Sequence, residues 1–241
     1  MPETLLCYVC LHNFNNMVKF IEAELTTLKR EVDEMWMLVY NQLDRAGEAI
    51  LTLDRELASQ VMVCERRVNA SELKIDSNVE DIIALYNPIG VDLRFVLAVL
   101  KINSNLERLG DFAEGISRFV EHFPDPALDP DLVEQLRLDK MITEVLEMLR
   151  LAKEAFDKES LDLATQVFAK DDILDKINAE APNILRDYID ANPETTLTCL
   201  HLISIIRKLE RAGDHITNMA EEIVFFIDAK VLKHQKTQNE N

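Results

Sequence analysis

The motif E-R-x-G-D occurs twice, as ERLGD at residues 107–111 and as ERAGD at residues 210–214. In each copy a glutamate lies four residues before an aspartate, so both carboxylates share one face if the segment is an α-helix. Like charges at this spacing destabilise a helix by roughly a few tenths of a kcal/mol, and a glycine inside a helix costs about 1 kcal/mol relative to alanine. Because both copies keep this unfavourable combination, we expect Gly110 and Gly213 to let a backbone, an ion or a ligand come close.

Further polar side chains precede each motif at matched distances. Glu65 and Asp111 each lie 23 residues from Pro88. Asn69 and Glu107 each lie 19 residues from the same proline. If each half contains an antiparallel helical hairpin, residues equidistant from the turn lie at the same height, and the second half repeats this arrangement closely. The resulting candidate metal ligands are Glu65, Asn69, Glu107, Asp111, Asp171, Asp175, Glu210 and Asp214.

Clustered carboxylates suggest cation chemistry. Three or four of them repel one another unless a cation lies among them or they take up protons. Oxygen donors with no cysteine and little histidine suit hard or borderline cations, so we expect iron, zinc, manganese or magnesium ions at carboxylate clusters on the surface. The alternative is that an acid-rich helical surface produces such pairs by chance. Arg108 and Arg211, beside the acids, are expected to be salt-bridge partners, with anion binding as the alternative role.

The motifs of common catalytic sites are missing from the sequence. No glutamate precedes a histidine by three residues, as it does in the Glu-x-x-His of di-iron helical bundles. The G-x-x-x-x-G-K-[ST] phosphate loop, G-x-S-x-G and H-E-x-x-H are also missing. We therefore predict a protein that is not an enzyme and has no catalytic residues.

The composition is that of an acidic, helical and soluble protein. The 241 residues carry a net charge of −18, which argues against nucleic acid as a partner because phosphate backbones attract basic surfaces. No run of 18 apolar residues could span a membrane. Four scattered cysteines fit the reducing cytoplasm, where we expect the protein to reside.

An internal duplication organises the chain. LASQV at residues 57–61 returns as LATQV at residues 163–167, an offset of 106, and the two E-R-x-G-D motifs are 103 residues apart. Each half shows three stretches with apolar residues three or four apart, and no useful length alternates as a strand does. We predict an all-α fold of two tandem homologous three-helix bundles with six long helices. The stripes of the two third helices are Val99, Ile102, Leu106, Leu109, Ala113, Ile116, Val120 and Phe123, and Leu202, Ile205, Leu209, Ala212, Ile216, Met219, Ile223 and Phe226.

Prolines mark the expected helix boundaries. Asn87-Pro88, Asn192-Pro193 and Asp129-Pro130 each predict an N-cap followed by proline in the first turn, and Pro182 is expected to bend its helix. The first bundle is predicted at 17–123 and the second at 131–233, joined by a linker at 124–130. Residues 1–16 are expected to be an extension that is poorly ordered or absent from the native protein, and residues 234–241 a polar tail.

Together, the paired E-R-x-G-D motifs and the Asn-Pro pairs that precede the third helices make the sequence resemble the PhoU family of bacterial phosphate-signalling proteins. The resemblance covers about residues 17–233 and is closest in YNPIGVDLRFVLAVLKINSNLERLGDFAEGI, residues 86–116. It implies a cytoplasmic, homodimeric regulator that represses the phosphate-starvation response. It also implies multinuclear metal clusters held by Glu107/Asp111, Glu210/Asp214 and Asp171/Asp175. The chain departs from the pattern at Asn69, whose amide carries no charge, so the first site is expected to bind metal more weakly.

The partners that the resemblance implies are the phosphate ABC transporter, chiefly its ATPase subunit, and a membrane sensor histidine kinase. The protein would then meet the membrane only through these partners. Two other interpretations stay open. One is a metal-dependent enzyme or metal store that uses the carboxylate sites, and the other is a purely structural helical adaptor.

Overall fold

The computed structural model describes residues 3–124 and 126–229, with side chains from residue 20 onward. Within these residues every regular element is a helix. They are α1 (Glu3–Thr52), α2 (Arg55–Tyr86), α3 (Gly90–Glu121), α4 (Pro130–Leu136), α5 (Leu138–Lys158), α6 (Leu161–Ala191), the 3-10 helix η1 (Pro193–Thr195) and α7 (Thr196–Asp228). None of the described helices combines the length and apolar character needed to cross a membrane.

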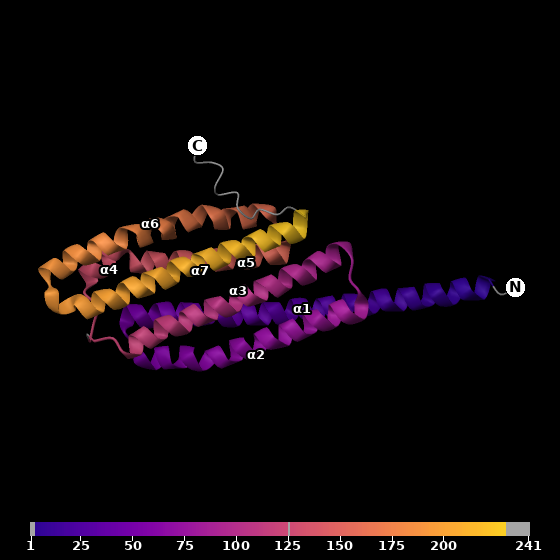
Figure 1. Ribbon diagram of the computed structural model, residues 1–241, viewed down its shortest axis with the longest axis horizontal. Helices are drawn as coiled ribbons and strands as arrows, with labels where there is room; N and C mark the ends of the chain where they lie inside the picture. The colour runs from indigo at the N-terminus through magenta and orange to yellow at the C-terminus, as the bar shows by residue number, and fades with distance from the viewer. Residues whose placement is uncertain (1–2, 125, 230–241) are drawn as a thin grey trace.

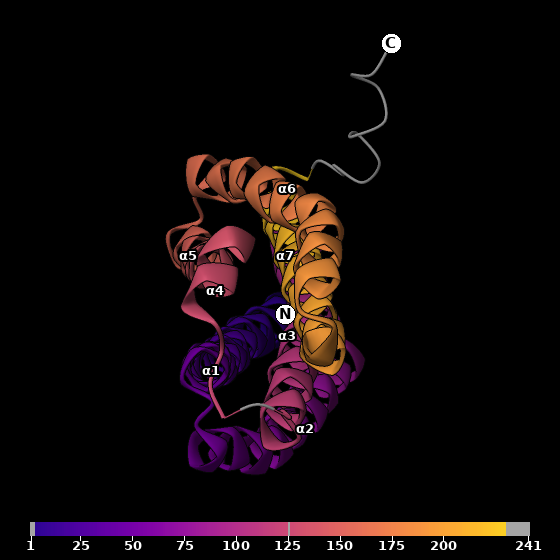
Figure 2. The same cartoon turned by 90° about the vertical axis from the view of Figure 1, so that its left-hand side faces the viewer.

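The helices form two layers (Figure 1). One layer contains α1, α2 and α3 packed against one another, and the other contains α5, α6 and α7, with the short α4 beside α5 and α6. The layers meet along α3 and α7 and also along α1 and α5, as the end-on view shows (Figure 2). The prediction of two tandem all-α three-helix bundles is confirmed.

The predicted apolar stripes form the core of both bundles. Every residue of the two third-helix stripes is buried, and removal of such apolar surface from water is the main force that holds helices together. Between the bundles, the Trp36 indole Nε1 on α1 donates a hydrogen bond to the Leu149 carbonyl on α5 at 3.2 Å, and its ring stacks on Phe156. A buried indole N–H needs such an acceptor, so this contact helps to define how the bundles meet.

The turn between the first and second helices is the same in both bundles. Leu53 has a φ of 50°, and the carboxylate of the next residue, Asp54, accepts a hydrogen bond from the backbone N–H three residues later. Glu159 also has a φ of 50°, and the Ser160 hydroxyl accepts the equivalent bond. Neither left-handed position holds glycine, the usual residue at a helix C-terminus, so these turns are marked in the sequence by their capping residues, Asp54 and Ser160.

The three Asn-Pro or Asp-Pro pairs differ in their structural roles. Asp129-Pro130 behaves as predicted, because the Asp129 carboxylate caps α4 and the proline occupies its first turn. Pro193 also opens a helix, the short η1 that leads into α7. The prediction for Asn87-Pro88 is wrong: Asn87 ends α2 with a φ of 46°, and α3 begins only at Gly90. Asparagine tolerates this left-handed conformation better than most residues, which allows it to end a helix.

Two further features modify the predicted outline. The first helix of the second bundle is broken at Arg137, whose φ of 52° separates α4 from α5. Where the sequence predicts disorder over 1–16, residues 3–16 are helical backbone at the start of α1, while residues 1–2 and the tail 234–241 lie outside the described residues. Whether the extension belongs to the native protein stays a prediction. Pro182 lies within α6, which is visibly curved (Figure 2).

Candidate carboxylate site

In the first bundle, Gly110 on α3 makes room for side chains of α2. A Cβ at this position would lie 2.9 Å from Oε2 of Glu65 and 3.1 Å from a methyl group of Val68. Glu65 is only 5% exposed, so it is enclosed between α2 and α3 and does not project into solvent. The predicted close approach at the glycine is thus made by a buried carboxylate and its apolar neighbour.

Glu65 is held in a setting that favours its neutral form. The Gln42 amide on α1 donates a hydrogen bond to Oε2 of Glu65 at 2.8 Å, whereas Oε1 has no hydrogen-bond partner among the described residues. Burial raises the pKa of Glu65 to about 7, the Gln42 bond opposes this shift, and the negative charges of Asp111, Glu114 and Glu107 add to it. Protonation at neutral pH, or a nearby cation, would relieve the unfavourable charge.

The motif acids of α3 lie at the outer side of this cluster. Burial and then the charge of Asp111 raise the pKa of Glu107, which Arg108 partly opposes. Arg108 pairs with Asp111 at 3.1 Å and with Glu107 at 3.6 Å, so the salt-bridge prediction is confirmed for this arginine. Asn69 is exposed, and no hydrogen bond or ion pair ties it to the acids within the described part of the chain.

The second bundle repeats the arrangement around Gly213. A Cβ there would clash with Cδ1 of Leu174 and would lie 3.3 Å from Oδ1 of Asp171. Asp171 is 1% exposed. Burial raises the pKa of Glu210, and the charges of Asp214, Asp175 and Asp171 raise it further, in that order. The four acids predicted to form one group therefore lie close enough to affect one another.

The prediction of surface clusters needs correction for two of the eight residues. Glu65 and Asp171 are buried against the glycines, while Asn69, Asp175 and Asp214 are exposed. The spacing along the chain places these residues at equal heights, but it does not give the rotation of each helix about its axis. That rotation turns the first candidate ligand of α2, Glu65, and of α6, Asp171, inward.

Sequence reasoning missed two members of the first cluster. Gln42 lies on α1, which the hairpin argument did not include, and no acidic spacing marks it. Glu72 continues the α2 face three residues after Asn69; burial raises its pKa, followed by the charge of Asp76. Membership of Glu72 in the cluster could have been predicted from the sequence, because residues three apart on a helix are neighbours.

The types of side chain in the clusters suit a metal ion, but their positions in the described structure do not form a metal site. Carboxylate oxygens are the ligands that hard cations prefer, and buried oxygens of Glu65 and Gln42 lack hydrogen-bond donors in the described structure. However, no three histidine, cysteine, aspartate or glutamate side chains converge on one point as a metal site requires, as far as the described residues go. Metal binding by the eight candidate ligands stays a prediction.

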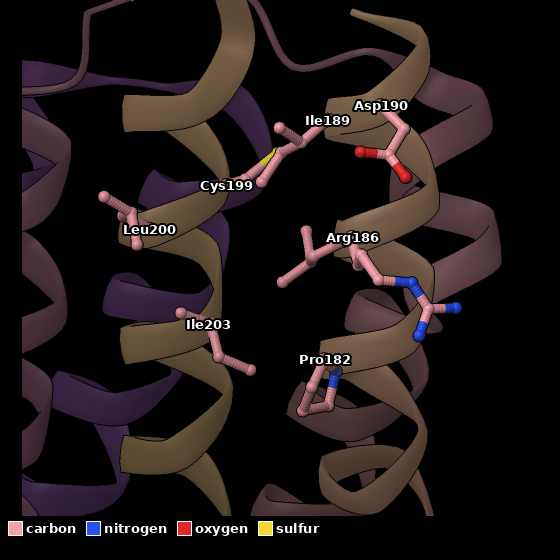
Figure 3. A pocket seen from close by; sticks show the side chains of 8 residues that line it. Pro182, Arg186, Ile189, Asp190, Cys199, Leu200 and Ile203 are labelled. Atoms are coloured by element: carbon pink, nitrogen blue, oxygen red, sulfur yellow. The ribbon is translucent and has the colours of Figure 1, made fainter. Parts of the chain in front are cut away.

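A separate hollow of about 270 Å³ lies between α6 and α7 (Figure 3). Pro182 and Ile189 of α6 face Cys199 and Ile203 of α7 across it, and its walls are mainly apolar. Such a lining offers little to an ion, so the chemistry predicted from the sequence belongs to the carboxylate clusters.

Comparison with known proteins identifies the architecture. The family model described as "PhoU domain" matches residues 32–120 and again residues 138–223. The chain belongs to the PhoU family. Each of its two PhoU domains contains an E-R-x-G-D motif whose glycine packs beside a buried acid, Glu65 or Asp171, so the duplicated site coincides with the duplicated domain.

Individual relatives of this PhoU-family chain cover nearly its whole length. It is 31% identical to the phosphate-specific transport system accessory protein PhoU homolog 1 of Thermotoga maritima, over 88% of the chain and 90% of the relative. It is 32% identical to the phosphate-specific transport system accessory protein PhoU of Serratia marcescens, over 88% and 86%. The crystal structure of PhoU from Pseudomonas aeruginosa superposes with a TM-score of 0.82 at 29% identity, covering 87% of this chain and 99% of the other.

Proposed function

We propose that this PhoU-family protein is a cytoplasmic regulator of phosphate uptake that represses the phosphate-starvation response. The observation that carries the proposal is the match of both bundles, over most of the chain, to proteins named as accessory proteins of a phosphate-specific transport system. An accessory role also fits the lack of common catalytic motifs in the sequence. The protein would act through binding and would not catalyse a reaction.

The proposed partners are the ATPase subunit of the phosphate ABC transporter and a sensor histidine kinase. The relatives are named for a transport system, which supports an association with the transporter. A long, two-layered helical surface with a net charge of −18 offers several faces for such contacts. A homodimer would present two copies of that surface, and attachment to the membrane would occur through the partners alone.

Metal ions are proposed to modulate this regulator. In the second bundle Asp171, Asp175, Glu210 and Asp214 would hold the ions, and in the first bundle Glu65, Glu107 and Asp111 would do so with the Asn69 amide. A cation would supply the positive charge that these coupled carboxylates lack. The raised pKa values of Glu65 and Glu210 support the proposal, because burial first and the neighbouring carboxylates second disfavour the charged form of each side chain.

The regulatory role is tested by deleting the gene in its own host and restoring it in trans. In high phosphate, we expect the deletion to raise the expression of phosphate-starvation genes, and the wild-type gene to return it to the starting level. Phosphate uptake is measured in the same cultures. An unchanged starvation response in the deletion strain would contradict the proposal, provided that the protein is present in wild-type cells.

A further inference from the structure

An open groove of about 670 Å³ lies between α3 of the first bundle and α7 of the second. Its charged lining consists of Arg108, Arg118, Lys208 and Arg211 against Asp111 and Glu114. Four cations beside two acids stand out in a chain whose net charge is −18. The arginines of both E-R-x-G-D motifs line this groove, so the duplicated motifs contribute to one surface at the joint between the bundles.

Two of the four cations are neutralised by the two acids. Arg108 pairs with Asp111 at 3.1 Å, and Arg118 pairs with Glu114 at 2.9 Å. In contrast, Lys208 and Arg211 have no carboxylate at salt-bridge distance within the part of the chain that the structure describes. Counting the lining side chains alone, and with His215 neutral, the groove carries two positive charges in excess; Glu107, which also pairs with Arg108 at 3.6 Å, lies outside this lining.

Neutral groups of the first bundle lie against these two cations. The Arg211 guanidinium lies 5.2 Å from the centre of the Phe112 ring, a contact that orients the guanidinium and leaves its charge intact. Lys208 lies against Gly115, where a Cβ would come within 2.7 Å of Nζ. The glycine thus leaves space for the ammonium group. Both side chains keep N–H donors available for a ligand.

We propose that the groove binds a dianionic tetrahedral oxyanion, with inorganic phosphate or a small phosphate monoester as its source. Two excess positive charges match the charge of such a ligand. The Arg211 guanidinium can donate to two oxygens at once, and the Lys208 ammonium can donate to another. The ligand would bridge α3 and α7. This binding is a property of the chain alone and does not depend on the regulatory role proposed above.

Isothermal titration calorimetry with the full-length protein tests the proposal. The protein is freed of metal with a chelator, because a bound cation would itself attract phosphate, and ionic strength is held constant with sodium chloride at pH 8. Inorganic phosphate and glycerol 3-phosphate are titrated separately. We expect saturable binding of at least one of them, with one site per chain.

Two double variants separate a specific site from general charge effects. Lys208→Gln with Arg211→Gln should weaken binding by about tenfold or more, since each removes charged hydrogen-bond donors. Lys140→Gln with Lys176→Gln removes the same charge from exposed positions on α5 and α6 and should leave the affinity within about twofold. Circular dichroism checks folding, and Lys208→Gln alone replaces the groove variant if the latter loses helicity.

The outcomes distinguish the two sources of the ligand. Binding of phosphate alone points to the free ion, binding of the monoester alone to a phosphorylated metabolite, and binding of both to the phosphoryl group that they share. The proposal is overturned if neither titrant binds saturably, or if the groove variant binds as tightly as the α5–α6 control.

Discussion

Gly110 and Gly213 each accommodate side chains from the neighbouring helix. Their position between two acids, repeated in both halves, was enough to predict a close approach. The identity of the approaching group was not predictable, because it depends on how α2 and α6 are rotated about their axes. Only the structure shows that Glu65 and Asp171 turn inward at these points.

Gly110→Ala is expected to lower the free energy of unfolding by about 1–3 kcal/mol, as overpacking in a core does. The added Cβ would meet Glu65 and Val68, and Glu65 cannot move freely because Gln42 holds it. Gly115→Ala, in the same helix, is the matched control, since its Cβ would meet only the flexible end of Lys208. This variant should be neutral or more stable by up to about 1 kcal/mol. Urea unfolding measures both; an equal effect of the two substitutions would show that the space beside Gly110 is not restricted.

Glu65 is expected to make the metal-free protein less stable as pH rises from about 4.5 to about 7. Its pKa in the folded protein is raised from 4.5 to about 7, so within this window the folded form keeps a proton that the unfolded chain has lost. The contribution of this bound proton to the free energy of unfolding is fully present below pH 4.5 and is lost by about pH 7. Glu65→Gln keeps the side-chain shape and should remove roughly 2–3 kcal/mol of this pH dependence. The measurement is urea unfolding across the pH range, and identical pH profiles for the two proteins would refute the expectation.

At the scale of the helices, the sequence predicts more about apolar faces than about ends. The stripe that begins at Val99 and its counterpart from Leu202 are buried as their spacing predicts. Five of the described helices end at single residues in left-handed conformations, namely Leu53, Asn87, Arg137, Glu159 and Ala229. Four of these residue types carry no turn signal, so the break that creates α4 could not be recognised, and the two equivalent hairpin turns are marked only by the caps Asp54 and Ser160.

Glu159→Gly is expected to stabilise the α5–α6 turn by about 1 kcal/mol. Glycine adopts a φ of 50° without the steric conflict that a Cβ creates. The Glu159 side chain is exposed and forms no ion pair within the described structure, so little is lost when it is removed. Glu159→Ala, which retains a Cβ, is the control and should be close to neutral. Thermal unfolding distinguishes them, and a Tm for the glycine variant no higher than that of the alanine variant would contradict the expectation.

At the scale of the whole molecule, the duplication could be recognised in the sequence because the repeated motifs keep a nearly constant spacing. The packing of one bundle on the other could not be predicted from the sequence. It relies on contacts between distant residues, such as Trp36 with Leu149, and on the meeting of α3 with α7. The groove that contains both motif arginines is a consequence of that packing, and no feature of either half alone predicts it.

The two halves are expected to differ in metal binding. All four candidate ligands of the second half are anionic, whereas Asn69 replaces one carboxylate in the first half by a neutral amide, and nearby charges act strongly when partly desolvated. Glu210→Gln with Asp214→Asn should therefore lose more bound metal than Glu107→Gln with Asp111→Asn. Elemental analysis gives metal per chain, and circular dichroism should show that both variants keep their helices. Equal metal content in the wild type and both variants would mean that the acids are not ligands.

The central claim is regulation through the phosphate transport machinery, and capture of partners tests it most directly. The tagged full-length protein is used to capture proteins from detergent-solubilised membranes of its own host, grown in high and in low phosphate, with an unrelated tagged acidic helical protein as control. We predict that mass spectrometry shows enrichment of the phosphate ABC transporter ATPase and a sensor histidine kinase over the control, to an extent that changes with phosphate. Enrichment of neither protein under either condition would contradict the account.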